Sequence, residues 1–238
     1  DLPHGLTTYD EDEARRPIEF TRVSNLVEHA FPALLEACGG SLAGKRVLDV
    51  ACNCGGFSIE ATKHGCDSVL GVDIVDHYVE QATFLKNALG LDNAEFQTLD
   101  VDDITEENIG LFDVTFCFGL LYHLENPVHS MRKIAEVTKE YMLIDTEVLK
   151  IPKGKQFTKR PLWAMNFPVT GTDEGQHRTT SRWRYAKDRP IQYAPSEKGV
   201  IQLMEALGFS KVEKIQPTDA TVEKRYHRGR RASFLATR

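Results

Sequence analysis

Three aspartates in the first half of the chain are spaced in a way that could bind a nucleoside. Asp49 lies within a short apolar run, Asp73 ends a second apolar run, and Asp100 follows a third. Ligands of open α/β sheets bind at the carboxyl ends of the strands, where a carboxylate can accept hydrogen bonds from a ribose diol or an adenine amino group. We therefore expect Asp73 to bind a ribose and Asp100 to bind the edge of an adenine ring.

A turn of small residues, 52–56, joins the first apolar run to a helical pattern. Such a turn lets the backbone approach a ligand closely, and the following helix offers unpaired N–H groups to it. A dinucleotide site would read G-x-G-x-x-G, but the small positions here are Ala51, Asn53 and Gly55, with Asp49 ahead of them. An acid at the head of the turn suits a ligand with an amine better than one with two phosphates.

The stretch from Arg46 to Asp73 resembles motif I of the class I S-adenosylmethionine-dependent methyltransferases, which reads roughly D-x-G-x-G-x-G. Ala51 and Asn53 stand where that family usually has glycine. The resemblance implies that S-adenosylmethionine is the cofactor and that Asp49 and the turn hold its methionine end. The cofactor-binding residues that it implies are Asp49, Ala51, Asn53, Gly55, Asp73, Ile74, Asp100, Val101 and Phe118.

Tyr122 and His123 lie just beyond the C-terminal end of a predicted strand, 112–119, at the edge where such sheets bind their ligands. A histidine at this place could act as the general base for a hydroxyl or amine nucleophile. Alternatively, His123 only packs and forms hydrogen bonds where the strand ends. We name His123 and Tyr122 as the candidate catalytic residues, with Tyr122 also excluding water and aligning the acceptor.

Three further motifs look like those of the tRNA wobble-uridine carboxymethyltransferase group: G-L-L-Y-H-L at 119–124, P-S at 195–196 and R-A-x-x-x-A at 231–236. That group uses carboxy-S-adenosylmethionine, and the resemblance implies that Tyr122 and Arg231 match the residues that hold its extra carboxylate. The N-terminal domain that supplies a further lysine in that group has no counterpart in this sequence. We therefore favour ordinary S-adenosylmethionine, with Arg231 binding the acceptor.

The apolar runs alternate with helical patterns through the first 148 residues, which predicts a doubly wound, mostly parallel sheet. The predicted strands are 47–51, 68–72, 93–99, 112–119 and 141–148, and the predicted helices between them are 57–64, 76–89 and 127–137. A helix that begins at Ser196, a strand over 209–215, a loop over 218–229 and a last strand over 231–236 follow. They match the antiparallel hairpin that class I methyltransferases add to the sheet. We expect an α/β fold with a Rossmann-like seven-stranded sheet, an antiparallel C-terminal hairpin strand and a cap insertion.

Four segments follow from this pattern. An N-terminal arm and lid helix occupies 1–42, the cofactor-binding core 43–148, a substrate cap 149–195, and the C-terminal part of the sheet 196–238. One helix is expected over residues 18–38 despite Pro32; it either packs on the sheet edge or covers the pocket, with Tyr9, Phe20 and Arg22 nearby. The cap has no clear periodicity and mixes basic with aromatic residues, so we expect Trp163 and Trp183 to bind the acceptor.

The composition and the charge distribution limit the remaining choices. Of 238 residues, 41% are hydrophobic and 27% charged, which is typical of an ordinary globular protein. Residues 1–148 hold 10 basic against 27 acidic side chains, whereas residues 149–238 hold 19 against 8. The basic C-terminal part either faces an anionic acceptor or is merely solvated.

Five cysteines, an odd number, favour a reduced cytoplasmic compartment, and Cys52-x-Cys54 has no second ligand pair that would make a zinc site. We expect no metal, no signal peptide and no membrane segment. The preferred function is methylation of a small-molecule acceptor at oxygen or nitrogen, in metabolism or natural-product biosynthesis. A tRNA wobble-uridine (carboxy)methyltransferase and a noncatalytic S-adenosylmethionine-binding protein are the alternatives. The acceptor, the pathway and the oligomeric state stay open.

Overall fold

The computed structural model describes residues 26–150, 160–166, 192–217 and 224–238. The helices and strands are, in chain order, α2 (Phe31–Ala37), β1 (Arg46–Val50), α3 (Gly56–Lys63), β2 (Ser68–Asp73), α4 (Asp76–Leu89), β3 (Ala94–Thr98), η3 (Val101–Asp103), α5 (Glu106–Ile109), β4 (Phe112–Phe118), η4 (Leu121–His123), α6 (Pro127–Glu136), β5 (Thr138–Glu147), β6 (Trp163–Asn166), β7 (Gln192–Pro195), α8 (Glu197–Ala206), β8 (Lys211–Ile215), α9 (Lys224–His227) and β9 (Arg231–Thr237). The predicted arm with Tyr9, Phe20 and Arg22, and most of the predicted cap with Trp183, lie outside the described residues.

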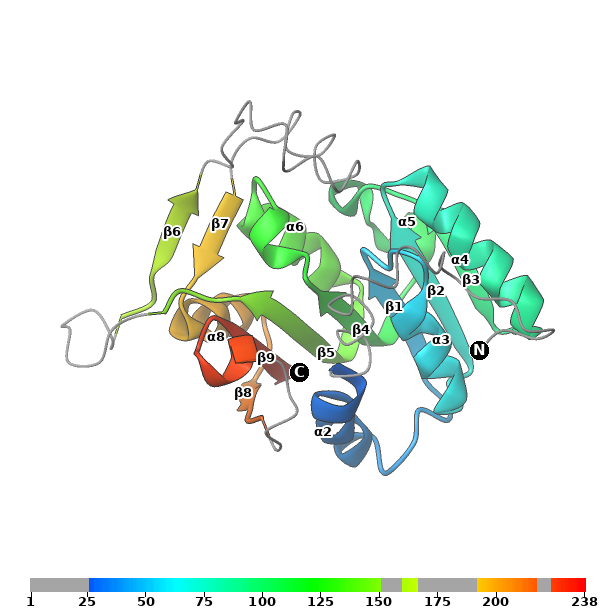
Figure 1. The fold of residues 1–238 in the computed structure, drawn as a ribbon, viewed down its shortest axis with the longest axis horizontal. Helices are drawn as coiled ribbons and strands as arrows, with labels where there is room; N and C mark the ends of the chain where they lie inside the picture. The colour runs from blue at the N-terminus through cyan, green and yellow to red at the C-terminus, as the bar shows by residue number, and fades with distance from the viewer. Residues whose placement is uncertain (1–25, 151–159, 167–191, 218–223) are drawn as a thin grey trace.

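Seven strands form the main sheet in the order β3-β2-β1-β4-β5-β9-β8. Strands β1 to β5 pair in parallel, and β9 runs antiparallel between β5 and β8. The predicted seven-stranded sheet with its antiparallel C-terminal hairpin is therefore confirmed (Figure 1). The strand order reverses between β1 and β4, and an open sheet of this kind binds its ligands at the carboxyl ends of the strands beside that reversal.

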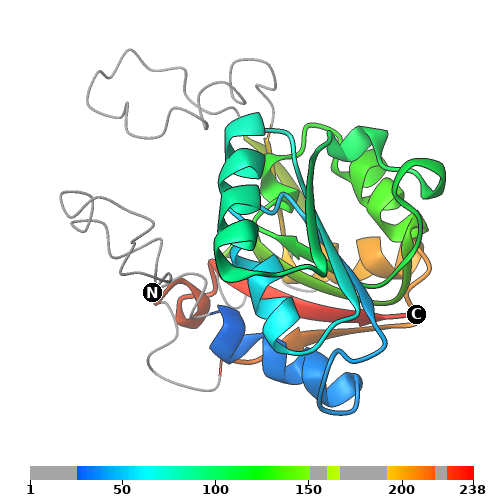
Figure 2. The same ribbon diagram turned by 90° about the vertical axis from the view of Figure 1, so that its right-hand side faces the viewer.

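Helices cover both faces of the sheet (Figure 2). On one face, α2 and α3 pack over a buried cluster that includes Phe31, Leu34 and Phe116. On the other face, α6 and α8 pack over a second cluster that includes Met131 and Met204. All seven residues of β4 are buried, as expected for a parallel strand that is covered on both sides. None of the described helices is long and apolar enough to cross a membrane.

The N-terminal helix differs from the single helix that we expected over 18–38. Its described part is helical over 26–29, turns at Ala30, and begins again as α2 with Pro32 in the first turn. Proline lacks a backbone N–H and fixes its own φ, so it fits the first turn of a helix but not the interior. The described residues around Pro32 therefore form two helical pieces, with a break at Ala30, in place of one continuous helix.

The predicted loop over 218–229 was also wrong in part, because it contains the short helix α9. The capping box between Thr105 and Asn108, which begins α5, and the 3-10 helices η3 and η4 were not predicted. Within the predicted cap, β6 pairs with β7 as a separate antiparallel ribbon, and β7 packs against η4. The part of the cap that the structure describes therefore adjoins the carboxyl edge of the sheet.

Gly71, in the middle of β2, faces the ring of Phe96 on the neighbouring strand β3. A Cβ atom added at Gly71 would lie 2.5 Å from Cδ1 of Phe96 and 3.0 Å from the Sγ atom of Cys52. We predict that Gly71→Ala lowers the free energy of unfolding by about 1 to 3 kcal/mol, which is the usual cost of overpacking a core. Urea denaturation measures this change.

The Phe96→Ala background provides the control, because it removes the ring that the new methyl group would meet. In that background, Gly71→Ala is expected to cost at least about 0.5 kcal/mol less than it does alone, since contacting residues are not additive. Strictly additive costs, or a Gly71→Ala protein as stable as its parent, would contradict the proposed close packing of these two residues.

Candidate active site

The turn after β1 holds three residues with left-handed backbones. Ala51 has φ 59°, Asn53 has φ 51° and Gly55 has φ 80°. Left-handed geometry costs a non-glycine residue roughly 1 to 2 kcal/mol, so Ala51 and Asn53 are the strained backbone positions of the turn. The side chain of Asn53 offsets part of the cost by accepting a hydrogen bond from the Cys54 N–H at 2.7 Å. The turn therefore keeps a backbone shape that would favour glycine at all three positions.

Asp73 links the end of β2 to this turn. One carboxylate oxygen accepts a hydrogen bond from the Asn53 N–H at 2.9 Å, and the other accepts one from the Val75 N–H at 3.0 Å. Burial raises the pKa of Asp73, and hydrogen bonds from the Val75, Asn53 and Ile74 N–H groups offset part of that rise. Asp73 thus already holds the turn in place, and its side chain also lines the crevice described below.

Asp49 lies behind the turn. Its carboxylate is 1% exposed and accepts a hydrogen bond from the Ser58 hydroxyl of α3 at 2.7 Å. Burial raises the pKa of Asp49 to about 7, the Ser58 hydrogen bonds lower it in part, and the charge of Asp73 raises it further. Alternation along β1 places Asp49 on the side of α3, while Leu48 and Val50 contribute to the cluster on the other face.

A crevice opens at the carboxyl edge, where β1, β2, η3 and η4 meet. It brings together six of the predicted site residues, from four separate segments. The residues that line it are Val50, Ala51, Val72, Asp73, Ile74, Leu99, Asp100, Val101, Leu120, His123 and Leu124. The apolar members were not predicted, although each lies within two residues of a predicted site residue: Val50, Val72, Leu99, Leu120 and Leu124.

The second predicted carboxylate of the crevice, Asp100, begins η3. Its Oδ1 atom accepts a hydrogen bond from the Asp102 N–H at 3.1 Å, which fixes the turn after β3. Ser130 of α6 donates a hydrogen bond to Asp102 at 2.5 Å and ties this turn to the neighbouring helix. Asp100 and Asp73 therefore lie at the ends of adjacent strands, on one wall of the crevice.

Tyr122 and His123 lie on η4, with their ring centroids 4.2 Å apart. His123 lines the crevice, whereas Tyr122 is 8% exposed and its ring lies 5.8 Å from the guanidinium carbon of Arg231. Arg231 is 2% exposed and forms an ion pair with Asp145 of β5, donating from Nε to Oδ1 at 2.6 Å. The structure therefore brings Tyr122 and Arg231 together, as their motif match implied, but also gives Arg231 an anionic partner.

Asp145 is the polar residue at this edge that sequence reasoning missed. It is fully buried and also accepts hydrogen bonds from Tyr226 of α9, at 2.6 Å, and from Ser233 of β9, at 2.9 Å. The ring of His29 packs edge-on against Tyr226, with centroids 5.1 Å apart. The only local signal for Asp145 is a charged residue within the apolar run of β5.

Two aromatic residues that we named as ligand contacts have other neighbours among the described residues. Phe118 packs against Phe57 of α3, with ring centroids 4.4 Å apart, on the face that α2 and α3 cover. Trp163 packs against the core cluster beneath α8, where a Cβ atom added to Gly199 would lie 3.1 Å from its indole nitrogen. The positions of Phe118 and Trp163 are those of packing residues, and neither lines the crevice.

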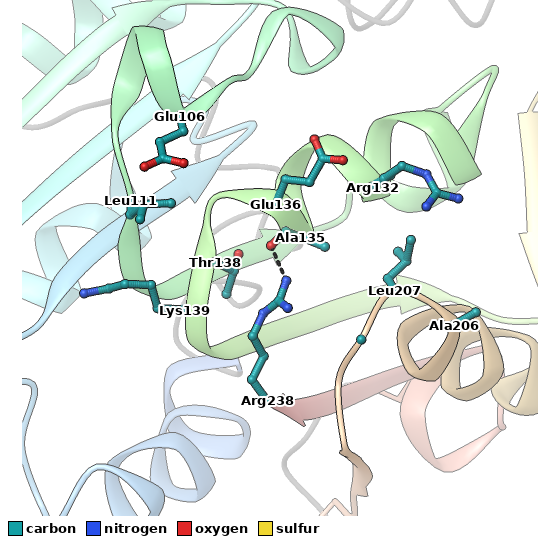
Figure 3. Close-up of a pocket in the computed structure, with 11 residues that line it drawn as sticks. Glu106, Leu111, Arg132, Ala135, Glu136, Thr138, Lys139, Ala206, Leu207 and Arg238 are labelled. Atoms are coloured by element: carbon teal, nitrogen blue, oxygen red, sulfur yellow. Dashed lines mark hydrogen bonds between the residues drawn. The ribbon is translucent and has the colours of Figure 1, made fainter.

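A wider groove of about 710 Å³ lies at the opposite edge of the sheet, where β4 and β5 begin (Figure 3). Its lining mixes cationic Arg132, Lys139 and Arg238 with acidic Glu106 and Glu136. Figure 3 shows the Arg238 guanidinium directed at the Ala135 carbonyl oxygen, to which it donates a hydrogen bond. Because parallel sheets bind ligands at the other edge, the smaller crevice is the better candidate site. Among the residues that the structure describes, no group of three or more His, Cys, Asp or Glu side chains could hold a metal ion.

Comparison with known proteins gives a match to a protein family and alignments to relatives over about half of each chain. The sequence matches the family described as a methyltransferase domain over residues 41–179. It is 30% identical over 115 residues to a tRNA U34 carboxymethyltransferase of Helicobacter acinonychis (strain Sheeba), covering 47% of this chain and 44% of that protein. It is 29% identical over 114 residues to a ubiquinone biosynthesis O-methyltransferase of Neisseria meningitidis serogroup A, covering 48% of each chain. The chain spans about half the length of the curated relatives it matches.

Two solved structures resemble the whole chain more fully. The N-terminal domain of EvdMO1, solved in the presence of SAH and D-fucose, gives a TM-score of 0.61 at 19% identity, covering 87% of this chain and 79% of that one. Magnesium protoporphyrin IX methyltransferase (ChlM) from Synechocystis PCC 6803, with bound SAH, gives 0.58 at 18% identity, covering 98% and 90%. At these identities the likeness establishes a common fold.

Proposed function

The chain belongs to the methyltransferase-domain family, and from this membership we propose that it transfers a methyl group from S-adenosylmethionine to a small-molecule acceptor. The acceptor atom is an oxygen or a nitrogen of a metabolite or a natural-product intermediate. The observation that carries the proposal is the crevice in which Asp73 and Asp100, from adjacent strand ends, lie beside the strained turn at Ala51. The five free cysteines fit a reduced, cytoplasmic compartment.

The side chains and backbone groups that line the crevice have the chemistry to bind an adenosine. Asp73 supplies a carboxylate for a ribose diol, and Asp100 and the Val101 N–H supply an acceptor and a donor for the adenine edge. Ile74 and Leu99 provide apolar surface for the purine faces. The N–H groups of the turn and the nearby charge of Asp49 suit the carboxylate and the amine of a methionine end. When bound, S-adenosylmethionine supplies an electrophilic methyl group on a sulfonium.

The residues of this chain contribute to the reaction chiefly by positioning the reactants. Methyl transfer needs the nucleophile in line with the bond that breaks, so alignment and exclusion of water account for much of the rate. His123 of η4 lines the crevice on the side nearest the ribbon β6–β7, and the buried Tyr122 ring packs behind it, so the two rings exclude water there. His123 takes the proton from the acceptor hydroxyl or amine where that group must be deprotonated.

The crevice is narrow in this structure. Its volume of about 40 Å³ is far below the roughly 300 to 1,000 Å³ of typical ligand pockets. Leu120, His123 and Leu124, in and beside η4, form one wall, and this wall must move outward to admit a nucleoside. The proposal therefore includes an outward shift of η4 when the cofactor binds.

A tRNA wobble-uridine (carboxy)methyltransferase is the second candidate, and the pairing of Tyr122 with Arg231 favours it. These are the two residues that the motif match assigned to an extra carboxylate, and they are neighbours here. Against it, Asp145 already offsets the charge of Arg231. A gel shift with tRNA that weakens steeply as salt rises would favour this candidate over a small-molecule acceptor.

Isothermal titration calorimetry with S-adenosylmethionine and S-adenosylhomocysteine tests the proposal. We expect dissociation constants in the micromolar range, about −8 kcal/mol. NAD⁺ is the matched control, because it shares the adenosine but brings a pyrophosphate, for which the turn lacks the glycine pattern. If neither sulfur nucleoside binds, or if NAD⁺ binds as tightly, the proposed cofactor is wrong. Binding without transfer of a labelled methyl group to any acceptor tried, tRNA included, would favour the noncatalytic alternative.

A further inference from the structure

We infer that Asp145 is a positioning residue which, through Arg231 and the buried Tyr122 ring, sets the position of the His123 ring at the wall of the crevice. The inference rests on the proposed function only for its effect on catalysis. The placement of the rings does not depend on that function. It begins from the placement of Asp145 near the end of β5, one strand away from β4, after which η4 follows. The carboxylate is fully buried and joins parts of the chain that lie more than 80 residues apart.

The hydrogen bonds of Asp145 fix its orientation. Oδ1 accepts from Nε of Arg231 at 2.6 Å, while Oδ2 accepts from the Tyr226 hydroxyl at 2.6 Å and the Ser233 hydroxyl at 2.9 Å. Three donors from α9 and β9 thus converge on one buried carboxylate. A buried charge with this many partners has one orientation of low free energy, because every alternative leaves a polar group unpaired.

Asp145 holds Arg231 in turn. The Nη2 atom of Arg231 lies against the same Asp145 oxygen without the geometry of a hydrogen bond, so Nε carries the directed contact. Burial alone would lower the pKa of Arg231, but Asp145, Tyr122 and Tyr226 together raise it, so the guanidinium stays charged. The charge stays beside the Tyr122 ring, 5.8 Å from its centroid, where a cation and an aromatic ring attract each other.

Tyr122 connects Arg231 to the crevice, because its ring packs against the ring of His123. Its ring is buried against the guanidinium, and its centroid lies 4.2 Å from that of His123, which lines the crevice. Side chains packed at these distances move together, because protein interiors have few voids into which one of them could shift alone. Loss of the Asp145 charge would therefore release Arg231, then Tyr122, and so change the position of the His123 ring.

NMR of the histidine rings tests the placement without any ligand. The aromatic ring of Tyr122 displaces the ring-proton signals of His123 by its ring current, so these signals report how close the two rings are. The His123 signals are identified by their absence from His123→Gln, and Tyr122→Leu gives their positions without the neighbouring ring. In Asp145→Asn we expect the His123 signals to move most of the way towards their Tyr122→Leu positions.

Asp113→Asn is the matched control for loss of a buried aspartate. Asp113 is 7% exposed, forms an ion pair with Lys139 and accepts a hydrogen bond from the Arg46 N–H, but it lies at the amino edge of the sheet. This variant should leave the His123 signals in place. His123 signals that stay at their parent positions in folded Asp145→Asn, or that move equally in Asp113→Asn, would overturn the inference.

Asp145→Asn leaves a buried, unpaired guanidinium and could fail to fold, since breaking a buried pair costs about 3 to 5 kcal/mol. The double variant Asp145→Asn/Arg231→Gln removes both charges together and should fold. We expect its His123 signals to move as far as in the single variant, because nothing then holds Tyr122; signals at the parent positions would overturn the inference.

Activity gives a second readout, distinct from a loss of fold. We expect kcat to fall by at least about tenfold in the double variant, because alignment is lost, while the dissociation constant for S-adenosylhomocysteine changes less than about twofold. Equal losses in kcat and in cofactor affinity would overturn the positioning role. If the parent protein binds no S-adenosylhomocysteine, the proposed function fails, and the NMR result still decides whether Asp145 places the rings.

Discussion

Replacing Asp73 with alanine is expected to weaken the binding of S-adenosylhomocysteine by about a hundredfold, because two hydrogen bonds to a carboxylate, each of about 1.5 kcal/mol, are lost. Asp73 faces the crevice, and its carboxylate also holds the turn through the Asn53 N–H. The substitution therefore removes both the proposed acceptor for the ribose diol and a support of the strained backbone at Ala51 and Asn53. Calorimetric titration of the parent and the variant measures the change.

Asp67→Ala is the control for this prediction. Asp67 immediately precedes β2, at the opposite edge of the sheet from Asp73, and likewise accepts a hydrogen bond from a backbone N–H, that of Gly44 at 2.8 Å. Its replacement should leave the dissociation constant within about twofold of the parent value. An Asp73→Ala protein that binds as tightly as its parent, or an Asp67→Ala protein that loses as much, would remove Asp73 from the cofactor site.

Replacing Asp49 with asparagine is expected to stabilise the ligand-free protein at neutral and alkaline pH. Burial raises the pKa of Asp49 to about 7 in the folded protein, against 3.8 as the ordinary value. The folded state therefore holds this proton more tightly than the unfolded state does. The resulting stability is fully present below about pH 4 and is lost as the pH rises through about 7, a total of about 4 kcal/mol. Asparagine has no charge to bury and avoids that loss.

The advantage of Asp49→Asn over the parent should therefore grow with pH. Urea denaturation should show the difference in the free energy of unfolding increasing by about 3 kcal/mol between pH 5 and pH 8. The unpaired amide N–H of asparagine offsets part of the gain at every pH, by about 1 to 3 kcal/mol. The Ser58 hydroxyl keeps an acceptor in the variant, so the local packing is retained.

Asp113→Asn is expected to change the free energy of unfolding with the opposite pH dependence. Burial acts to raise the pKa of Asp113. The hydrogen bond from the Arg46 N–H and the Lys139 ammonium together lower it by more than burial raises it, so the net pKa shift is downward. Its replacement should cost stability near neutral pH and cost less as the pH falls below the ordinary aspartate range. If Asp49→Asn shows no pH-dependent gain, Asp49 is not held in the folded state as a strained buried charge. We also expect Asp49→Asn to bind S-adenosylmethionine more weakly than the parent protein. In that case the Asp49 carboxylate serves cofactor binding at a cost in stability.

Local sequence patterns predicted the elements that form the crevice. Helix α4 has the bounds that its pattern predicted, and β1, β2 and β4 are offset by at most one residue at each end. These elements are encoded by short apolar runs, turn residues and helix-ending glycines, all of which act within a few residues of each other. That is why the order Asp73 and then Asp100, at adjacent strand ends, could be inferred before the structure.

Features set by distant contacts could not be predicted in this way. The partners of Asp145 lie 81 to 88 residues further along the chain, and no periodicity connects them. The pairing of β4 with β5 shifts its register between Phe112 and Val114, and nothing in the local pattern of β4 signals this irregularity. The segment that carries Tyr122 and His123 is a three-residue 3-10 helix, which is too short to show a period.

The insertion of β9 between β5 and β8 has a consequence for synthesis on the ribosome. Translation delivers β9 after all the other described strands, and domains acquire structure from the N-terminal side as they are made. Until Arg231 and Ser233 have left the exit tunnel, the carboxylate of Asp145 has neither of them to pair with, and β5 presents an open edge. A nascent chain stalled before these residues would expose the unpaired edge of β5, whose free N–H and C=O groups can pair with a strand of another chain. We therefore expect such a chain to bind a holdase chaperone.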